Sequence, residues 1–484
     1  MYRVTAFLIF TCLFFSCDKN SGIIKLSPLF SDGMVLQRNT KINIWGSALP
    51  NKDVKVISSW SEELEIKSND SGIWVGKLQT PGAGGPFSLK IISENENISI
   101  HNILIGEVWL ASGQSNMEMP IKGYPPNDTI LNWESEVLKA RYPNIRMFNV
   151  EKKFSTEPSK ELNGSWIKVS PENVENFSST AYFFSREIHK TLNVPIGIIH
   201  SSWGGSPAES WTSENKLRDL GFFIDTLDLI SENMTDDLSF SNVQNKIELS
   251  PFLPKVLFNG MINPLIPFSI KGVIWYQGES NVGRHKQYMH LFPGMIEDWR
   301  NYWGEDFPFY FVQISPFRYN KTLGIDDVSQ ELREAQRKTL RLPKTGMVVT
   351  LDIGDYDNIH PSNKQDVGKR LARLALFNDY DAGLSPMGPI LKSSDLVDSS
   401  IRIEFVHTGT GLLYIDNHNK QFQIASANMQ FFDANVILNG NYVILSSEFV
   451  TSPKYVKYAW SDTPEATLFN SEALPASSFM IEVK

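Results

Sequence analysis

The segment WLASGQSNMEMP, residues 109–120, holds a serine that is placed as either a nucleophile or a helix cap. An apolar run ends at Gly113, and Ser115 follows between two carboxamide side chains. The nucleophile elbow G-x-S-x-G does not fit, because Met117 stands where its second glycine would be. Serine often caps a helix, yet the N–H groups at a helix N-terminus can equally stabilise an oxyanion. The local sequence leaves both roles open, and the partners of Ser115 must decide.

A serine nucleophile needs a base within hydrogen-bond reach and a group that orients the base. Two of the eight histidines follow apolar runs of the same kind, His200 in GIIHSSWGG and His360 in DIGDYDNIHPS. Asp357 precedes His360 by three residues, so its carboxylate can fold back against the ring nitrogen that faces away from the serine. No acid lies close to His200, which is typical of a packing residue. The sequence therefore favours His360 over His200 as the base.

Two further clusters offer hydrogen-bond donors for a developing oxyanion. SSWGGSP places Gly204 and Gly205 where bare backbone N–H groups can approach a ligand closely. WYQGESN places Gln277 and Glu279 after another apolar run. The Gln277 carboxamide can donate a hydrogen bond, whereas Glu279 can orient His360 or accept a hydrogen bond from a substrate hydroxyl. Either cluster alone is no more than a common turn, but together with the serine and histidine segments they indicate one site.

All these clusters end short apolar segments that alternate with helix-like ones. The apolar segments are ILIGEVWLASG, VPIGIIHSSWGG, IKGVIWYQGES, FPFYFVQIS and TGMVVTLDIGD. Strands that are apolar throughout are typical of a parallel sheet with helices on both faces. Ligands of such sheets bind beyond the carboxyl ends of the strands. The pattern predicts an α/β catalytic domain over residues 101–383 with its site at that edge.

Both flanks of the chain have the texture of antiparallel strands. Residues 23–100 hold short segments of alternating polar and apolar residues, separated by Pro, Gly, Asn and Asp clusters. This spacing predicts an N-terminal β-sandwich domain. Residues 384–484 repeat the texture, which predicts a C-terminal β-rich domain.

Composition and motif content indicate which classes of partner and cofactor to expect. The net charge of -9 argues against nucleic acid or an anionic membrane surface as a partner. No H-E-x-x-H motif, cysteine ligand set, phosphate loop or dinucleotide fingerprint occurs, so we expect neither a metal nor another cofactor. The 12 tryptophans suit large cores and sugar-binding surfaces alike.

The N-terminus has the form of an export signal. Arg3 precedes an apolar run that ends at Phe15, and Ser16-Cys17 follows. This arrangement predicts that residues 1–16 are removed and that Cys17 is lipidated, which gives a periplasmic or cell-surface lipoprotein whose only membrane contact is the lipid anchor. Phe14 is unusual three residues before the cysteine. The alternatives are an ordinary cleaved signal, hence a secreted protein, or a buried N-terminal strand.

Taken together, the chain resembles the SGNH (GDSL-like) hydrolase superfamily, and within it the sialate O-acetylesterase branch of the carbohydrate acetylesterases. The matching segments are LFSDGMVLQR (29–38), GEVWLASGQSNMEMP (106–120), GIIHSSWGGSPAESW (197–211), IKGVIWYQGESN (270–281), DNIHPSNKQDVGKRLA (357–372) and KYAWSDTPEATLFNSEALPASSF (457–479). The resemblance implies a three-layer α/β/α domain. It also implies that Ser115 is the nucleophile, with His360 as base and Asp357 as acid.

The resemblance further implies three oxyanion donors: the Ser115 amide, a glycine amide for which we favour Gly205 over Gly204, and a side chain of the third motif. The superfamily usually has G-x-N-D in that motif, and here Gln277-Gly278-Glu279 replaces it. Gln277 therefore becomes the expected third donor. The same departure leaves open whether Asp357 or Glu279 orients His360.

Three functions are compatible with this sequence. The first is a serine esterase that removes O-acetyl groups from carbohydrates, with acetylated sialic acids favoured. The second is the same enzyme acting on acetylxylan or another glycan. The third is a non-catalytic carbohydrate-binding protein, against which the intact set of Ser115, Asp357 and His360 weighs.

Overall fold

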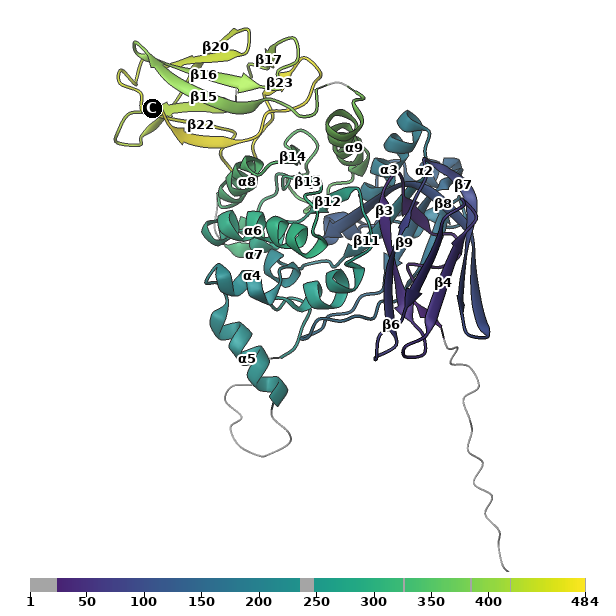
Figure 1. Ribbon diagram of the computed structural model, residues 1–484. Helices are drawn as coiled ribbons and strands as arrows, with labels where there is room; N and C mark the ends of the chain where they lie inside the picture. Colours follow the sequence, from purple (N-terminus) through teal and green to yellow (C-terminus); the bar gives the residue numbers. More distant parts are fainter. Residues whose placement is uncertain (1–23, 236–247, 325–326, 384, 418, 484) are drawn as a thin grey trace, which may run out of the picture.

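A mainly parallel sheet with helices on both faces forms the centre of the molecule, which confirms the predicted fold class (Figure 1). The computed structural model describes residues 24–235, 248–324, 327–383, 385–417 and 419–483. The predicted signal segment and Cys17 lie outside the described residues. Across the described ranges, no helix combines the length and apolar character needed to cross a membrane.

The central sheet has the strand order β10-β9-β11-β8-β12-β13-β14. All neighbours along this path are parallel except β10, which runs antiparallel to β9. The strands are β8 (Glu96–Gly113), β9 (Tyr142–Val150), β10 (Gly164–Val169), β11 (Ile196–Ser202), β12 (Gly272–Tyr276), β13 (Phe309–Val312) and β14 (Thr345–Val348). The segments that end in the serine, glycine and glutamine clusters are the adjacent strands β8, β11 and β12, so their carboxyl ends meet at one edge.

Helices bury both faces of this sheet, which is why its strands are apolar throughout. The helices α3 and α9 pack against each other and share one hydrophobic cluster with residues of β8, β11 and β12. The opposite face packs on α6 and α8. The helices are α1 (Ser115–Glu118), α2 (Trp133–Lys139), α3 (Ser179–Leu192), α4 (Glu214–Asp219), α5 (Ile224–Thr235), α6 (His285–Trp303), α7 (Asn320–Leu323), α8 (Ser329–Lys338) and α9 (Lys364–Tyr380).

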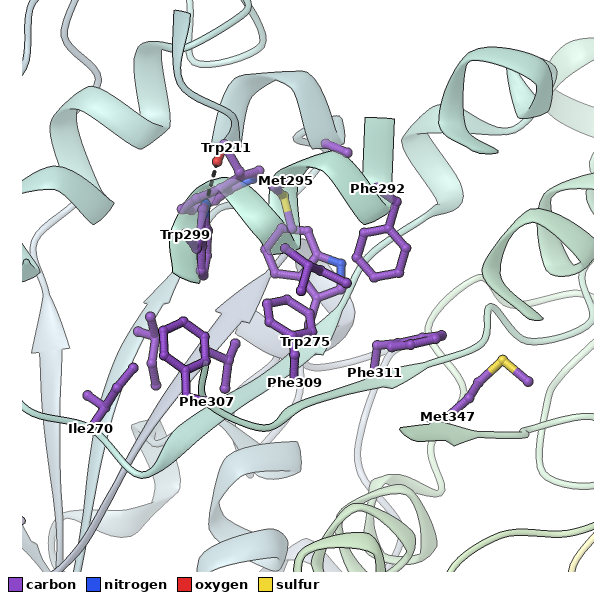
Figure 2. Close-up of a cluster of buried hydrophobic side chains, with 14 of the residues drawn as sticks. Trp211, Ile270, Trp275, Phe292, Met295, Trp299, Phe307, Phe309, Phe311 and Met347 are labelled. Atoms are coloured by element: carbon purple, nitrogen blue, oxygen red, sulfur yellow. Dashed lines mark hydrogen bonds between the residues drawn. The ribbon is translucent and has the colours of Figure 1, made fainter. Parts of the chain in front are cut away.

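Aromatic side chains dominate the core between the sheet and α6 (Figure 2). Trp275 of β12 lies with its ring centroid 6.3 Å from Phe292 and 5.8 Å from Trp299, both on α6. The Trp299 indole also donates a 2.9 Å hydrogen bond to the carbonyl of Trp211. These large rings fill the core and hold β12 in place next to the edge of the sheet where the site lies.

The N-terminal strands form two layers, and one of them continues into the central sheet. β8 runs through the domain boundary expected at residue 100, pairing with β7 in its first half and with β11 and β12 in its second. The layers consist of β1 (Lys25–Leu26), β3 (Lys41–Ser47) and β6 (Ile73–Gln79) in one sheet, and β2 (Val35–Gln37), β4 (Asp53–Ser58), β5 (Glu63–Lys67) and β7 (Gly84–Ser93) beside β8 in the other.

The C-terminal strands form small antiparallel sheets that lie beyond α8 and β14 (Figure 1). They are anchored by Asp462, whose carboxylate accepts hydrogen bonds from the N–H and hydroxyl of Ser329 at the start of α8. The strands are β15 (Ile390–Val397), β16 (Ser400–Val406), β17 (Leu412–Tyr414), β18 (Phe422–Ala425), β19 (Phe431–Asp433), β20 (Asn435–Asn439), β21 (Tyr442–Ser446), β22 (Tyr455–Tyr458), β23 (Leu468–Asn470) and β24 (Phe479–Glu482).

Candidate active site

Ser115 is the first residue of α1, directly beyond the end of β8. Gly113 makes this turn possible, because it has φ +138° and a Cβ there would lie 2.1 Å from the Tyr276 carbonyl oxygen. The N-cap is Gln114, and no side chain caps the helix. Of the two roles that the local sequence leaves open, the cap is excluded. The Ser115 hydroxyl points to a histidine instead.

That histidine is His360. Its Nε2 lies 2.9 Å from Ser115 Oγ, and its Nδ1 lies 3.3 Å from Oδ2 of Asp128. Asn358 holds the histidine and the acid together, because its side chain accepts a hydrogen bond from the His360 N–H and donates one to Asp128 Oδ1. The result is a hydroxyl, an imidazole and a carboxylate in line, the order that general-base activation of a serine requires.

Asp128 lies in the loop between α1 and α2. Reciprocal backbone hydrogen bonds between Tyr124 and Asp128, of 2.6 and 3.2 Å, close this loop. Gly123, at φ +70°, lets the chain pass close to Asp128, since a Cβ would lie 2.1 Å from the Asp128 carbonyl oxygen. The sequence analysis missed Asp128, because 232 residues separate it from His360 and the only local signal is an acid in a proline-rich loop.

The prediction that Asp357 contacts His360 is wrong, because the structure places Asp128 against the His360 ring instead. The Asp357 carboxylate forms an ion pair with Arg318, and 59% of its side chain is exposed. The N–H groups of Asp357 and Asn358 both donate to Asp355 Oδ1, at 2.9 and 3.2 Å. The D-x-x-H spacing therefore builds a turn that directs Asp357 to the surface, and Asp128 takes the position behind the imidazole.

Burial lowers the pKa of both candidate histidines, His360 and His200. Burial lowers the pKa of His360, and the hydrogen bond that His360 Nδ1 donates to the Asp128 carboxylate works against that shift. His200 does not contact Ser115. Its Nδ1 lies 3.0 Å from Asn149 Oδ1 and its Nε2 lies 2.6 Å from Ser202 Oγ. Burial lowers the pKa of His200 to about 4, so this ring is neutral at physiological pH.

The two glycines expected to supply an oxyanion donor lie against the nucleophile. A Cβ on Gly204 would lie 3.5 Å from the Ser115 Cβ, so the turn after β11 touches α1. The Gly204 N–H donates a 2.5 Å hydrogen bond to Glu118 Oε2, which engages this amide. Gly205 has φ +75°, and its N–H has no recorded acceptor among the described residues. Of the two amides, that of Gly205 is the one open to a ligand.

The donor role expected for the Gln277 side chain is also corrected. Gln277 is buried, and its Nε2 points to Asn281 Oδ1 at 2.6 Å and to the Ser206 carbonyl at 3.3 Å. Its Oε1 accepts a hydrogen bond from the Tyr288 hydroxyl. Both Nε2 and Oε1 of Gln277 therefore bind neighbouring groups. The side chain stabilises the turn after β12 and does not point to Ser115.

Glu279 contacts neither Ser115 nor His360 and instead joins the two segments that carry them. Its Oε1 accepts a 2.5 Å hydrogen bond from Asn116 Nδ2, and the same nitrogen donates to the Ile359 carbonyl at 3.0 Å. Burial raises the pKa of Glu279. Lys364, whose ammonium group binds the Pro361 carbonyl, is equally buried, and burial lowers its pKa to about 7. These buried groups connect the serine segment to the histidine segment.

Known proteins similar to this chain are carbohydrate esterases. Residues 253–376, which include His360 but neither Ser115 nor Asp128, match the family model described as carbohydrate esterase, sialic acid-specific acetylesterase. A crystal structure of a novel carbohydrate acetylesterase from Xanthomonas citri is 34% identical, with a TM-score of 0.83 over 95% of this chain and 99% of that chain.

Two curated relatives are similar over the same extent. The sialate O-acetylesterase of Mus musculus is 29% identical over 530 residues, which cover 96% of this chain and 96% of the relative. The sialate O-acetylesterase of Homo sapiens is 28% identical, covering 96% of this chain and 94% of the relative. The similarity thus extends over the flanking β regions as well as the central domain.

Proposed function

The chain belongs to the carbohydrate acetylesterases of the SGNH type, and we propose that it removes O-acetyl groups from sialic acids through Ser115, His360 and Asp128. Membership makes it a carboxylic ester hydrolase that acts on O-acetylated carbohydrates. The choice of sialic acid rests on relatives that carry the name sialate O-acetylesterase and match nearly the whole chain. The observation that carries the residue assignment is the 2.9 Å contact between Ser115 Oγ and His360 Nε2.

In the proposed reaction, His360 Nε2 takes the Ser115 proton while Oγ attacks the acetyl carbonyl carbon. Asp128 holds the ring with its proton on Nδ1 and stabilises the imidazolium that forms. The sugar hydroxyl then leaves with the proton from His360. A water molecule, deprotonated by the same ring, attacks the acetyl-serine and releases acetate.

The negative charge on the acetyl oxygen needs donors that are already in place. We assign the backbone N–H groups of Ser115 and Gly205 to this task. The Ser115 amide lies at the first residue of α1, where a helix leaves N–H groups without an internal acceptor. Gly205 has a left-handed φ in the turn beside Ser115 and is exposed to solvent, so its amide is accessible to a ligand.

A panel of acetylated sugars tests the substrate. Acetate release should be faster from acetylated sialosides than from acetylated xylo-oligosaccharides at equal ester concentration. The reverse order would favour the second candidate, an acetylxylan or other glycan acetylesterase. The similar protein from Xanthomonas citri supports this candidate because it is named a carbohydrate acetylesterase, with no particular sugar. The non-catalytic alternative predicts no acetate release beyond that of the Ser115→Ala protein.

We also propose that the enzyme is exported and anchored by lipid on Cys17. Arg3, the apolar run after it and the Ser16-Cys17 step support this proposal. The full chain and its Cys17→Ala variant can be expressed and separated into membrane and soluble fractions. Only the wild-type protein should fractionate with membranes and carry acyl chains at Cys17. A soluble wild-type protein that starts at another residue would make it an ordinary secreted enzyme.

A further inference from the structure

Aromatic and basic side chains form a wall beside the turn that follows β11, the turn that touches the nucleophile. The wall consists of Lys152, Phe154, Trp203 and Phe252, which come from three separate segments. Lys152 and Phe154 follow β9, Trp203 follows β11, and Phe252 lies in the long segment between α5 and β12. Nothing in the reaction described above uses these side chains.

The two glycines connect this wall to Ser115. Trp203 is followed by Gly204, whose Cβ position lies 3.5 Å from the Ser115 Cβ. The next residue, Gly205, has its Cβ position 3.4 Å from Cε1 of the Phe252 ring. Trp203 itself donates its backbone N–H to the Gly113 carbonyl, 3.1 Å away. The segment that carries Trp203 therefore passes directly beside Ser115, and Phe252 packs on the next glycine of the same segment.

The rings of the wall are open to solvent to a degree that a purely structural role does not need. Phe252 is 49% exposed and Phe154 is 36% exposed. Phe154 lies edge-on to Trp203, with ring centroids 6.3 Å apart. Single exposed apolar residues are common on protein surfaces, but several gathered at one functional edge are typical of a binding surface.

Lys152 adds a positive charge to this surface. Its ammonium nitrogen lies 5.2 Å from the centre of the Trp203 ring, and 44% of its side chain is exposed. It binds Glu118 Oε1 at 2.6 Å, while the other oxygen of Glu118 accepts the Gly204 N–H. An ammonium group has three hydrogens, so Lys152 can hold a second carboxylate beside that of Glu118. The structure itself shows a carboxylate bound between this ammonium and a backbone amide.

We propose that this wall is the subsite for the sugar ring that bears the ester, and that Lys152 pairs with the carboxylate of that sugar. The aromatic rings contact the apolar C–H face of the pyranose, which removes apolar surface of both partners from water. The ammonium hydrogens of Lys152 that Glu118 does not use can donate to the carboxylate of an acidic sugar, a group that a neutral sugar lacks. The inference rests on the proposed function and deepens it, since it names the residues that distinguish a sialic acid from other acetylated sugars.

The test compares three esters in each variant: an acetylated sialoside, an acetylated xylo-oligosaccharide and p-nitrophenyl acetate, which has no sugar. In Phe252→Ala and Phe154→Ala, the ratio of kcat/KM on the sialoside to that on p-nitrophenyl acetate should fall about tenfold. In Lys152→Gln, the ratio of sialoside to xylo-oligosaccharide should fall about tenfold, and Lys152→Arg should restore much of it because the charge is kept.

Matched controls exist elsewhere on the surface. Phe377 on α9 is 44% exposed, close to the exposure of Phe252. Lys369 on α9 is 47% exposed and pairs with Asp366 at 3.2 Å, as Lys152 pairs with Glu118. Phe377→Ala and Lys369→Gln should leave both ratios within about twofold of wild type. Calorimetric binding of the deacetylated sialoside to the Ser115→Ala protein, with and without Phe252→Ala, gives an affinity that does not depend on turnover.

Each outcome decides one claim. Equal losses on all three esters in the wall variants would mean a structural role and would overturn the subsite. Unchanged ratios together with unchanged calorimetric affinity would place the sugar elsewhere. A wild-type enzyme that cleaves the xylo-oligosaccharide but not the sialoside would overturn the sialic acid proposal and the role of Lys152. In that case the ratios measured on the xylo-oligosaccharide still decide whether the aromatic rings hold the sugar.

Discussion

Replacing Asp128 by asparagine separates the acid found in the structure from the acid expected from the sequence. The Asp128 carboxylate is 3.3 Å from His360 Nδ1, and in the proposed reaction it stabilises the imidazolium that forms when Ser115 loses its proton. An asparagine amide in that place removes the charge and can donate to Nδ1, which favours the tautomer with its proton on Nε2. A ring in that tautomer cannot accept the serine proton.

The geometry sets the size of the effect. With charge centres roughly 4 Å apart and an effective dielectric constant of about 20, the attraction is on the order of 4 kcal/mol. Since a tenfold change in rate corresponds to about 1.4 kcal/mol, this gives an upper bound of about three decades in rate. The Asp128 side chain is 32% exposed, so solvent screens part of the attraction. We therefore expect Asp128→Asn to lower kcat on p-nitrophenyl acetate by about 10²- to 10³-fold.

Asp357→Asn is the matched control. It removes a surface ion pair with Arg318, and such pairs contribute roughly 0–1 kcal/mol, so even a full loss of that energy from the transition state would change kcat by about fivefold or less. The pH profile gives a second measurement. The carboxylate of Asp128 raises the pKa of His360, so Asp128→Asn should move the acid limb of kcat/KM to lower pH. A larger kcat loss in Asp357→Asn than in Asp128→Asn would refute the assignment.

Three further predictions follow from the same geometry. Ser115→Ala and His360→Ala should abolish ester hydrolysis with almost no change in Tm, and near-wild-type turnover in either would exclude it from catalysis. The acid limb of kcat/KM in the wild type should have its midpoint below the ordinary histidine pKa of about 6.5, because burial lowers the pKa of His360 and the base works only when neutral; a midpoint above that value would contradict the buried site. Gln277→Ala should lower the free energy of unfolding by about 1–3 kcal/mol, because the buried Tyr288 hydroxyl loses its acceptor; a loss of kcat at unchanged stability would instead return Gln277 to the oxyanion site.

The parallel sheet was predictable from the sequence, and so was the meeting of Ser115 and His360, two of the three residues that the proposed reaction uses. Ser115 and His360 could be predicted because each follows an apolar strand, and parallel strands bring their carboxyl ends to one edge. The acid could not be predicted, because Asp128 reaches His360 from a loop whose position depends on the Tyr124–Asp128 backbone pairing. Local spacing pointed to Asp357 instead, and only the fold shows that its turn faces outward.

Side-chain direction was the second feature that the sequence could not specify. Gln277 follows its strand as expected, but its carboxamide is directed by Asn281, Tyr288 and the Ser206 carbonyl, which come from later turns, a helix and a neighbouring loop. The continuity of β8 (Glu96–Gly113) through residue 100, where a domain boundary was expected, was hidden in the sequence for a related reason. The strand changes partners there, from β7 to β11 and β12, and the change of partner alters its polarity pattern without ending it.

Covalent labelling tests the central claim most directly. The wild-type enzyme is treated with a serine-reactive organophosphate, and the modified peptide is located by mass spectrometry while acetate release from an acetylated sugar is followed. The account predicts one adduct, on Ser115, with activity lost in proportion to labelling and with labelling strongly slowed in His360→Ala. An enzyme that still releases acetate when Ser115 is fully labelled, or that is inactivated by an adduct on another residue, would contradict it.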